Sequence, residues 1–314
     1  MSKLASSAFL TDRKIVFLLA TFCCFLWGSS YPAIKGGYAL FSIAPHDIPS
    51  KLVFAGWRFV LAGLALLAYA GISGKLKGGV PGRVLARFAL LGLSQTTLQY
   101  AIFYVGLAYA TGTKSSIMNA TGTFFSVLLA HYIYHNDRLT YPKIVGCLVG
   151  FLGVMVVNLG SGAGGLLAWD FTLLGEGFVV LAAFILAAAS IYGKRVSQGV
   201  DPFVMTGYQL VFGGSALLAI GYALGGKIDN FTVASASLLA YLVLLSALSI
   251  SIWSLLLKYN RVSTITAFNF LVPVFGVALS AVFLNEPIFK LSNGIALVLV
   301  SLGIWLVTKA PRNS

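Results

Sequence analysis

The sequence predicts an all-α polytopic membrane protein, with ten transmembrane helices arranged as two inverted five-helix repeats. Three observations lead to this fold class: an apolar composition, ten separate apolar segments, and a likeness between the two halves of the chain. Of the 314 residues, 59% are hydrophobic and only 9% are charged, and the mean hydropathy is +0.92. Soluble domains carry about 25% charged residues and could not hide so much apolar surface. This composition excludes a soluble enzyme, a nucleic-acid-binding domain and a disordered chain.

Ten apolar segments approach the ~20 residues that a helix needs to cross a bilayer. They cover residues 15–34, 52–71, 88–109, 113–134, 144–160, 173–193, 203–224, 236–257, 263–284 and 291–308. Lys, Asp, Pro and Gly residues separate them, as is typical of helix breakers. The stretch at mid-chain is rich in Gly and is expected to be a linker. We therefore divide the chain into a first five-helix repeat at 15–160, a linker at 161–171 and a second five-helix repeat at 172–310.

The basic residues outside the segments are distributed unevenly. If alternate gaps face the same side, one side holds fifteen Lys and Arg residues and the other holds five. The positive-inside rule assigns the richer side, which includes both termini, to the cytoplasm. The net charge of +13 is then an orientation signal that also suits contact with anionic lipid, and it calls for no nucleic-acid partner. We expect an integral protein of the bacterial inner membrane.

The two halves of the chain share a repeated pattern. Residues 54–68 and 205–219 are identical at seven of fifteen positions with an offset of 151, including the glycine pairs Gly56/Gly207 and Gly63/Gly214. A second stretch matches at an offset of 150 and pairs Asn119 with Asn269. Because five helices is an odd number, the second repeat enters the membrane from the opposite side. Inverted repeats are typical of secondary transporters, whose substrates bind near the midplane between the repeats.

Three motifs resemble the EamA-like branch of the drug/metabolite transporter superfamily. Trp27-Gly28-Ser29-Ser30 resembles the opening motif of helix 1, and Trp57-Arg58-Phe59 resembles the R-F element of helix 2. The run Phe270-Leu271-Val272-Pro273-Val274-Phe275, followed by Leu284-Asn285-Glu286-Pro287, resembles the end of helix 9. In the first half the pattern departs from the family, because Thr123 stands where helix 4 would carry Pro and Asp137 stands near the Glu position.

The resemblance implies ten helices, cytoplasmic termini and export of small metabolites. It further implies a central cavity lined by helices 1, 3, 4, 6, 8 and 9, with helices 2 and 7 beside it and helices 5 and 10 behind. The family includes exporters of amino acids, aromatic ones among them. Because substrates vary widely on one fold, the resemblance indicates a class of activity more than a ligand.

Polar and aromatic side chains within the spans are the substrate-binding candidates, because a polar group in a spanning helix is costly unless it meets a partner or a wet cavity. The candidates are Trp27, Ser30, Tyr31, Gln95, Thr96, Gln99, Tyr100, Ser116, Asn119, Ser246, Ser249, Trp253, Thr266 and Asn269. Each has a structural alternative. Interhelical hydrogen bonds, worth ~0.6 kcal/mol on average, would explain a single Gln. Trp and Tyr also form interfacial belts, the role favoured for Trp57, Trp169 and Trp305.

Asn119 and Asn269 are the candidates we favour as a pair. As repeat mates they are expected at similar depth on helices 4 and 9. Pro273 removes the backbone donor that would bond the carbonyl of Asn269, and such a break is tolerated where it lines a cavity.

Arg58 is the one cation well inside a predicted span. We expect it to be an anchor near the outer edge that pairs with Asp47; the alternative is capture of a substrate carboxylate. The acidic residues fall in loops or at span ends, and His131 is the sole further proton carrier within a span. A mechanism built on a membrane-embedded carboxylate is therefore disfavoured.

The sequence thus predicts a secondary transporter that exports small metabolites, with amino acids as the first choice, by alternating access. The alternatives are an exporter of other neutral metabolites or drugs, and a membrane-embedded enzyme for lipid or isoprenoid substrates. The expected partners are a small-molecule substrate and membrane lipid. No cofactor is expected, and Cys23, Cys24 and Cys147 lack metal-ligand spacing, so they are expected to be buried thiols.

Overall fold

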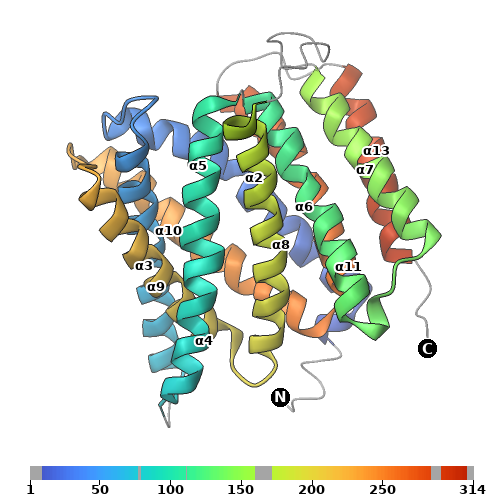
Figure 1. Cartoon of the computed structure of the whole chain (residues 1–314), viewed down its shortest axis with the longest axis horizontal. Coiled ribbons are helices and arrows are strands. Elements are labelled where there is room, and N and C mark those ends of the chain that lie inside the picture. Colours follow the sequence, from blue (N-terminus) through green and yellow to red (C-terminus); the bar gives the residue numbers. More distant parts are fainter. Residues whose placement is uncertain (1–8, 77–78, 111, 160–171, 284–290, 310–314) are drawn as a thin grey trace.

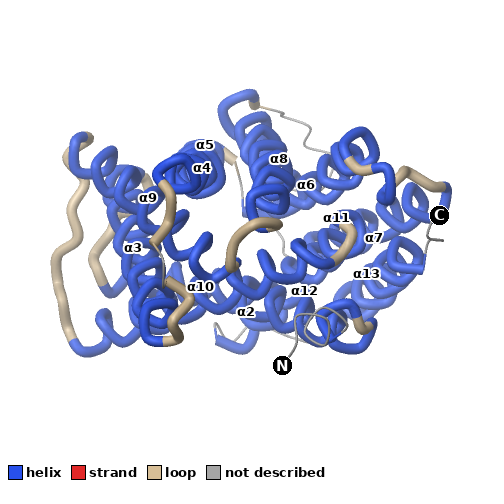
Figure 2. Tube along the Cα trace, turned by 90° about the horizontal axis from the view of Figure 1, so that it is seen from below, coloured by secondary structure: helices blue, strands red, loops and turns tan. Residues whose placement is uncertain are grey.

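A computed structural model of the chain describes residues 9–76, 79–110, 112–159, 172–283 and 291–309, and no strand occurs among them (Figures 1 and 2). The first half contains α2 (Arg13–Leu40), α3 (Ile48–Ile72), α4 (Gly82–Gly92), η1 (Leu93–Leu98), α5 (Gln99–Tyr109), α6 (Gly112–Ile133), η2 (His135–Asp137) and α7 (Tyr141–Leu159). The second contains η3 (Leu173–Gly177), α8 (Phe178–Ser197), α9 (Pro202–Ala223), α10 (Val233–Tyr259), α11 (Val262–Thr266), η4 (Ala267–Phe270), α12 (Leu271–Phe283) and α13 (Leu291–Lys309).

The described helices fit a polytopic membrane protein. Five are long and apolar enough to cross a bilayer, namely Arg13–Leu40, Ile48–Ile72, Leu173–Ser197, Pro202–Ala223 and Val233–Tyr259. Three shorter apolar helices cover Tyr141–Val156, Val262–Gly276 and Gly294–Lys309. The count of ten spans stays a prediction, and the predicted linker at 161–171 lies outside the described residues.

The first helices of the two halves run in opposite directions. Arg13, which begins α2, lines the same pocket as Lys194 in the last turn of α8 and Lys309 at the end of α13. These helix ends lie at one end of the bundle, the lower end in Figure 1. We call it the terminal end, and the other the opposite end.

Glycines at matching positions in the two repeats bring α3 and α9 together. A Cβ on Gly63 would lie 2.6 Å from the carbonyl oxygen of Gly207, and one on Gly214 would lie 3.0 Å from that of Gly56. Small residues allow backbones to approach this closely in membranes. The glycine pairs that revealed the repeat are thus the surface by which one repeat packs against the other.

The helices α7 and α13 make an equivalent crossing at the other side of the bundle. A Cβ on Gly146 would lie 2.7 Å from the carbonyl oxygen of Gly303, and one on Gly303 would lie 2.6 Å from the backbone nitrogen of Gly150. Figure 1 shows these two helices side by side. Each repeat therefore contributes one helix to each crossing.

Three Asp residues that the sequence places outside the spans begin helices. Asp12 accepts the N–H groups of Lys14 and Ile15 at the start of α2, and Asp47 accepts that of Ser50 at the start of α3. Asp201 does the same for α9 and also forms an ion pair of 3.2 Å with Lys75. Such N-caps satisfy the free amides of a helix start. These carboxylates are therefore used by the fold.

Candidate functional site

Polar and aromatic side chains of the two halves contact each other in pairs near the middle of the long helices. Trp27, Arg58, Gln209 and Ser246 each lie near the centre of their helix, on α2, α3, α9 and α10. Each contacts a residue of the other repeat, as described below. This is the depth at which transporters with inverted repeats bind substrate.

Two predicted aromatic candidates come together across the halves. The rings of Trp27 and Trp253 lie edge to face, with centroids 4.8 Å apart. Trp27 is half-buried and Trp253 is buried in the core that includes Cys24 and Phe268. Such ring pairs contribute ~0.5–1.5 kcal/mol beyond the area that they bury. The Sγ atom of Cys24 contacts the carbonyl oxygen of Phe268 at 3.2 Å, so the thiol is buried as predicted.

The region around η1 holds three further candidates. This π-helical turn interrupts the helix formed by α4 and α5, and π-turns are frequent at functional sites. Within it, Gln95 Oε1 accepts a hydrogen bond of 3.2 Å from Gln209 Nε2, and Thr96 packs against Gly213. These two side chains are used in packing between the halves. Gln99 follows directly and is buried.

Gln99 and Ser249, which are repeat mates, carry polar atoms without a partner. Among the described residues, neither Gln99 Oε1 nor Ser249 Oγ has a hydrogen-bond partner, although both atoms are buried. Leaving such an acceptor or hydroxyl unpaired costs ~1–3 kcal/mol. A polar ligand that reaches these atoms would recover this energy.

The other candidates have separate surroundings. Tyr100 packs on Phe59 at 4.8 Å between ring centroids, and Tyr31 is 42% exposed with its ring against Gly276. Ser30 donates to the carbonyl of Trp27 at 2.6 Å, and Thr266 donates to that of Val262 at 2.9 Å, so both hydroxyls are used within their own helices. The side chain of Ser116 lies outside the described residues.

The Asn pair is half-buried. Asn269 lies in η4, a 3₁₀ turn between α11 and α12, one turn before Pro273. Because Pro273 has no N–H, the carbonyl of Asn269 lacks its α-helical donor, which agrees with the break predicted there. No hydrogen bond to the side chain of Asn119 or Asn269 forms within the described ranges.

Arg58 lies deeper than the sequence analysis predicted. The helix α3 begins at Ile48, which places Arg58 about 15 Å of helical rise from its start. The side chain is 3% exposed, its Nε donates to Ser246 Oγ at 2.6 Å, and its guanidinium lies 4.9 Å from the ring centre of Phe59. Asp47 caps α3 instead of pairing with it. The expectation of an edge anchor was wrong, and the earlier helix start is the reason.

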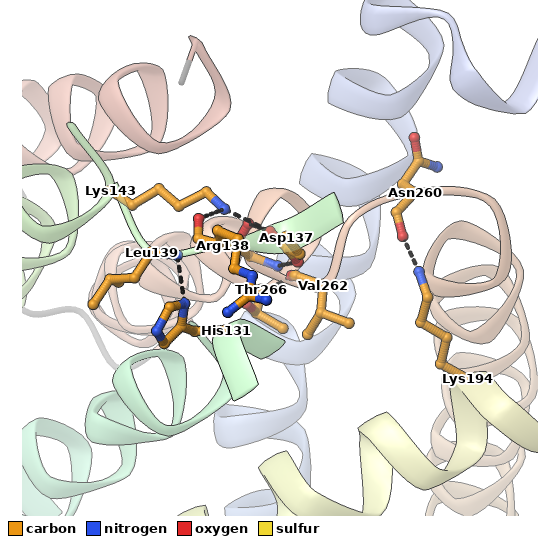
Figure 3. Close-up of polar contacts among 10 residues, drawn as sticks. His131, Asp137, Arg138, Leu139, Lys143, Lys194, Asn260, Val262 and Thr266 are labelled. Atoms are coloured by element: carbon orange, nitrogen blue, oxygen red, sulfur yellow. Dashed lines mark hydrogen bonds and ion pairs between the residues drawn. The ribbon is translucent and has the colours of Figure 1, made fainter. Parts of the chain in front are cut away.

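A second buried charged cluster lies at the terminal end (Figure 3). Lys143 Nζ lies 2.6 Å from Asp137 Oδ1 and donates to the carbonyl of Arg138 at 2.7 Å. The backbone N–H of Ser263 donates to Asp137 Oδ2 at 3.0 Å, and its hydroxyl donates to Oδ1. Asp137 was expected in a loop, and it lies in η2 between α6 and α7, where this cluster buries it between the halves.

His131 and Glu176, the remaining candidates for proton transfer, take part in local structure. The Nδ1 atom of His131 accepts the backbone N–H of Leu139 at 3.0 Å. Glu176 is buried and accepts from the N–H and the hydroxyl of Thr172 at 2.9 and 2.8 Å, where the second half begins. Within the described part of the chain no group of three or more His, Cys, Asp or Glu residues could hold a metal ion.

The EamA-like transporter family matches residues 14–159 and 173–309, one match for each half. The chain belongs to the EamA-like transporter family. The two matched regions agree with the two predicted repeats.

Several relatives of this EamA-like chain are known by name. It is 27% identical to the uncharacterized transporter YvbV of Bacillus subtilis over 91% of this chain and 89% of that one. It is 26% identical to a probable amino-acid metabolite efflux pump of Escherichia coli over 92% and 93%. A crystal structure at 18% identity superimposes with a TM-score of 0.76 over 95% of this chain and 97% of the other, which supports the fold.

The EamA-like bundle also has a basic pocket at its terminal end. Its volume is about 1320 Å³, and it lies among the ends of α2, α8, α10 and α13. Its cationic lining residues are Arg13, Lys194, Arg195, Lys258, Arg261 and Lys309, and no Asp or Glu is among the described residues that line it. A pocket of this charge attracts anions.

Proposed function

We propose that this EamA-like transporter exports small metabolites, amino acids first among them, by alternating access. In this proposal ten helices form two inverted five-helix repeats, and the substrate binds at their midplane. The observation that carries it is the meeting of polar and aromatic side chains from both halves at mid-helix. Gln99 and Ser249 supply unpaired polar atoms there, and Trp27 and Trp253 supply aromatic surface.

Amino acids suit this arrangement because they combine an apolar side chain with hydrogen-bonding ends. Two relatives named as probable amino-acid metabolite efflux pumps, from Escherichia coli and Salmonella typhimurium, each at 26% identity, support the same class of substrate. The basic pocket supports a cytoplasmic terminal end, since the side richer in Lys and Arg faces the cytoplasm. Carboxylates would gather at such a pocket before transport.

Exchange in liposomes tests the proposal. The purified protein is reconstituted, the vesicles are loaded with one unlabelled amino acid at a time, and uptake of the labelled compound is followed without a pH gradient. We expect counterflow for at least one amino acid. We expect none in protein-free vesicles, and none when the loaded compound is not a substrate. Absence of counterflow for all twenty amino acids by a folded protein would reject the substrate class.

Cysteine accessibility tests the proposed orientation. Single cysteines introduced at Lys75, Arg87 and Arg195 are expected to react with an impermeant maleimide only in inverted vesicles. One introduced at Asp229 is expected to react in intact cells. Labelling of Arg195→Cys from outside would contradict both the orientation and the inverted topology.

A further inference from the structure

We propose that Arg58 forms a carboxylate-binding site at the midplane, so that this transporter selects substrates with a free carboxylate. The inference rests on the proposed function for its transport readout, but it makes a claim of its own about ligand chemistry. It narrows the proposed substrates from small metabolites in general to those with a carboxylate that Arg58 can bind. The observations that carry it are the burial of Arg58, its missing counter-ion and its comparison with the repeat mate.

The guanidinium of Arg58 is buried with a charge that no described carboxylate neutralises. Its only hydrogen bond among the described residues is from Nε to Ser246 Oγ. Neither Nη atom has a hydrogen-bond partner among the described residues. An Arg near the bilayer centre costs ~2.5–3.5 kcal/mol on insertion scales, and such residues usually pair with an anion or mark a substrate path.

Ser246 fixes the direction in which this charge points. Its hydroxyl donates to the carbonyl of Leu242 at 2.7 Å, which leaves a lone pair to accept the Nε–H of Arg58. With Nε engaged and the guanidinium carbon 4.9 Å from the ring centre of Phe59, the two Nη atoms keep their donors for a ligand. A planar fork with two parallel donors matches the two oxygens of a carboxylate.

The repeat-related contact shows that the fold itself needs no charge here. Gln209 is the repeat mate of Arg58, and its side chain donates a hydrogen bond to Gln95. Gln95 lies next to Thr96, which is the repeat mate of Ser246. Both contacts join the second helix of one repeat to the third helix of the other. The neutral pair of Gln209 and Gln95 makes this contact in one arrangement of the repeats. The positive charge of Arg58 in the related contact is therefore not needed for packing.

The surroundings of Arg58 suit an amino acid attached to that carboxylate. Phe59 carries Tyr100 on its ring, and Gln99 lies beside Tyr100 in sequence with its amide oxygen unpaired. Tyr104 and Tyr38 belong to the same core, where Tyr104 is buried. The carboxylate would be held by Arg58, while hydroxyl and amide groups nearby accept hydrogen bonds from an ammonium group.

Thermal stabilisation of the detergent-purified protein tests the site without any transport. The probes are L-phenylalanine, L-leucine and L-alanine, each compared with its carboxamide, which keeps the side chain and loses the charge. The variant is Arg58→Gln, which installs the side chain of the repeat mate and retains a donor for Ser246. The matched control is Gln209→Leu, which breaks the neutral contact and leaves Arg58 in place.

We expect at least one amino acid to raise the melting temperature of the wild type more than its carboxamide does. The Arg58→Gln variant should then bind that amino acid roughly tenfold to a hundredfold more weakly, because one charged pair is lost. Its affinity for the carboxamide should be unchanged. The Gln209→Leu control should keep the preference for the carboxylate.

Two results would overturn the inference. One is equal stabilisation of the wild type by amino acids and carboxamides, and the other is an Arg58→Gln variant that keeps the carboxylate preference. Counterflow in liposomes separates the two proposals. If amino acids exchange and Arg58→Gln exchanges them with unchanged half-saturation, the carboxylate site fails and the export function stands. If carboxylates stabilise the wild type but none exchanges, the site stands and the export function fails.

Discussion

Lys143 and Arg58 are both buried cations, 1% and 3% exposed, but their neighbours differ. Lys143 has a carboxylate at 2.6 Å and a backbone carbonyl at 2.7 Å, and its partner Asp137 is held in turn by Ser263. Arg58 has one neutral hydroxyl and a ring face. In the first case the fold satisfies the charge. In the second, the described chain offers it no anion.

The difference separates architecture from ligand binding. A buried ion pair that loses one member leaves an uncompensated charge, so its removal acts on stability. Replacing a buried cation that has free donors breaks only a neutral contact, here the hydrogen bond to Ser246 Oγ, so the replacement acts mainly on what binds to the cation. Neutral contacts such as Gln209 with Gln95 give a third case, in which both effects are small.

The largest effect is expected for the cluster at the terminal end. Replacing Lys143 with Met leaves the carboxylate of Asp137 buried without its cation, which should lower the free energy of unfolding by about 3–5 kcal/mol. Thermal unfolding in detergent measures this. The double variant Lys143→Met with Asp137→Asn should recover part of the loss, because no charge is left over. A loss under about 1 kcal/mol for the single variant would refute the distinction.

The Asn pair tests whether residues without a protein partner act on ligand binding and leave stability unchanged. If Asn119 and Asn269 are substrate ligands, Asn119→Ala and Asn269→Ala should each weaken substrate binding by ~1–3 kcal/mol, roughly tenfold to a hundredfold. Stability should change little, since neither side chain has a hydrogen bond to lose among the described residues. Ligand titrations and melting curves on the same preparations check both. Lower stability with unchanged affinity in both variants would reassign the pair to packing.

The neutral contact should show a smaller effect. Replacing Gln95 and Gln209 together with Leu removes both ends of one interhelical hydrogen bond, which averages ~0.6 kcal/mol in membrane proteins. We expect a small loss of stability and an unchanged half-saturation for exchange. A tenfold rise in half-saturation would show that Gln95 touches the substrate.

The smallest effect is expected for the candidate proton carriers. His131→Ala and Glu176→Gln each remove a local hydrogen bond to the backbone, so exchange in liposomes without a pH gradient should stay measurable. Counterflow of wild type and variants, compared at equal protein content, provides the measurement. Loss of exchange by a folded variant would mean that transport needs that group to carry a proton.

Much of the architecture could be predicted from the sequence, because hydrophobicity and repetition act locally. The all-helical fold follows from the apolar segments. The repeat singles out Gly63 and Gly207, although their contact is known only from the structure. The break near Asn269 follows from the missing N–H of Pro273. Trp27 and Trp253 were both candidates, and their rings meet as a pair.

The two buried charged groups could not be predicted in the same way. The depth of Arg58 depends on where α3 begins, and Asp47 starts that helix four residues before the apolar run does. The burial of Asp137 depends on Ser263, which is more than a hundred residues away. Local patterns carry no information about such contacts. Thr96 and Gln95 were substrate-binding candidates, but they pack between the halves. This could not be predicted for the same reason, because their partners Gly213 and Gln209 lie in the other repeat.

The two glycine crossings have a consequence for motion. At α3 with α9, and at α7 with α13, backbones of opposite repeats pack closely at glycines, and moving either pair apart would lose this packing. A motion of one whole repeat against the other would open both crossings. Any hinge that spares both crossings must divide the molecule between them, so that each moving body contains helices from both repeats. The two sequence repeats and the two moving bodies are then different sets of helices.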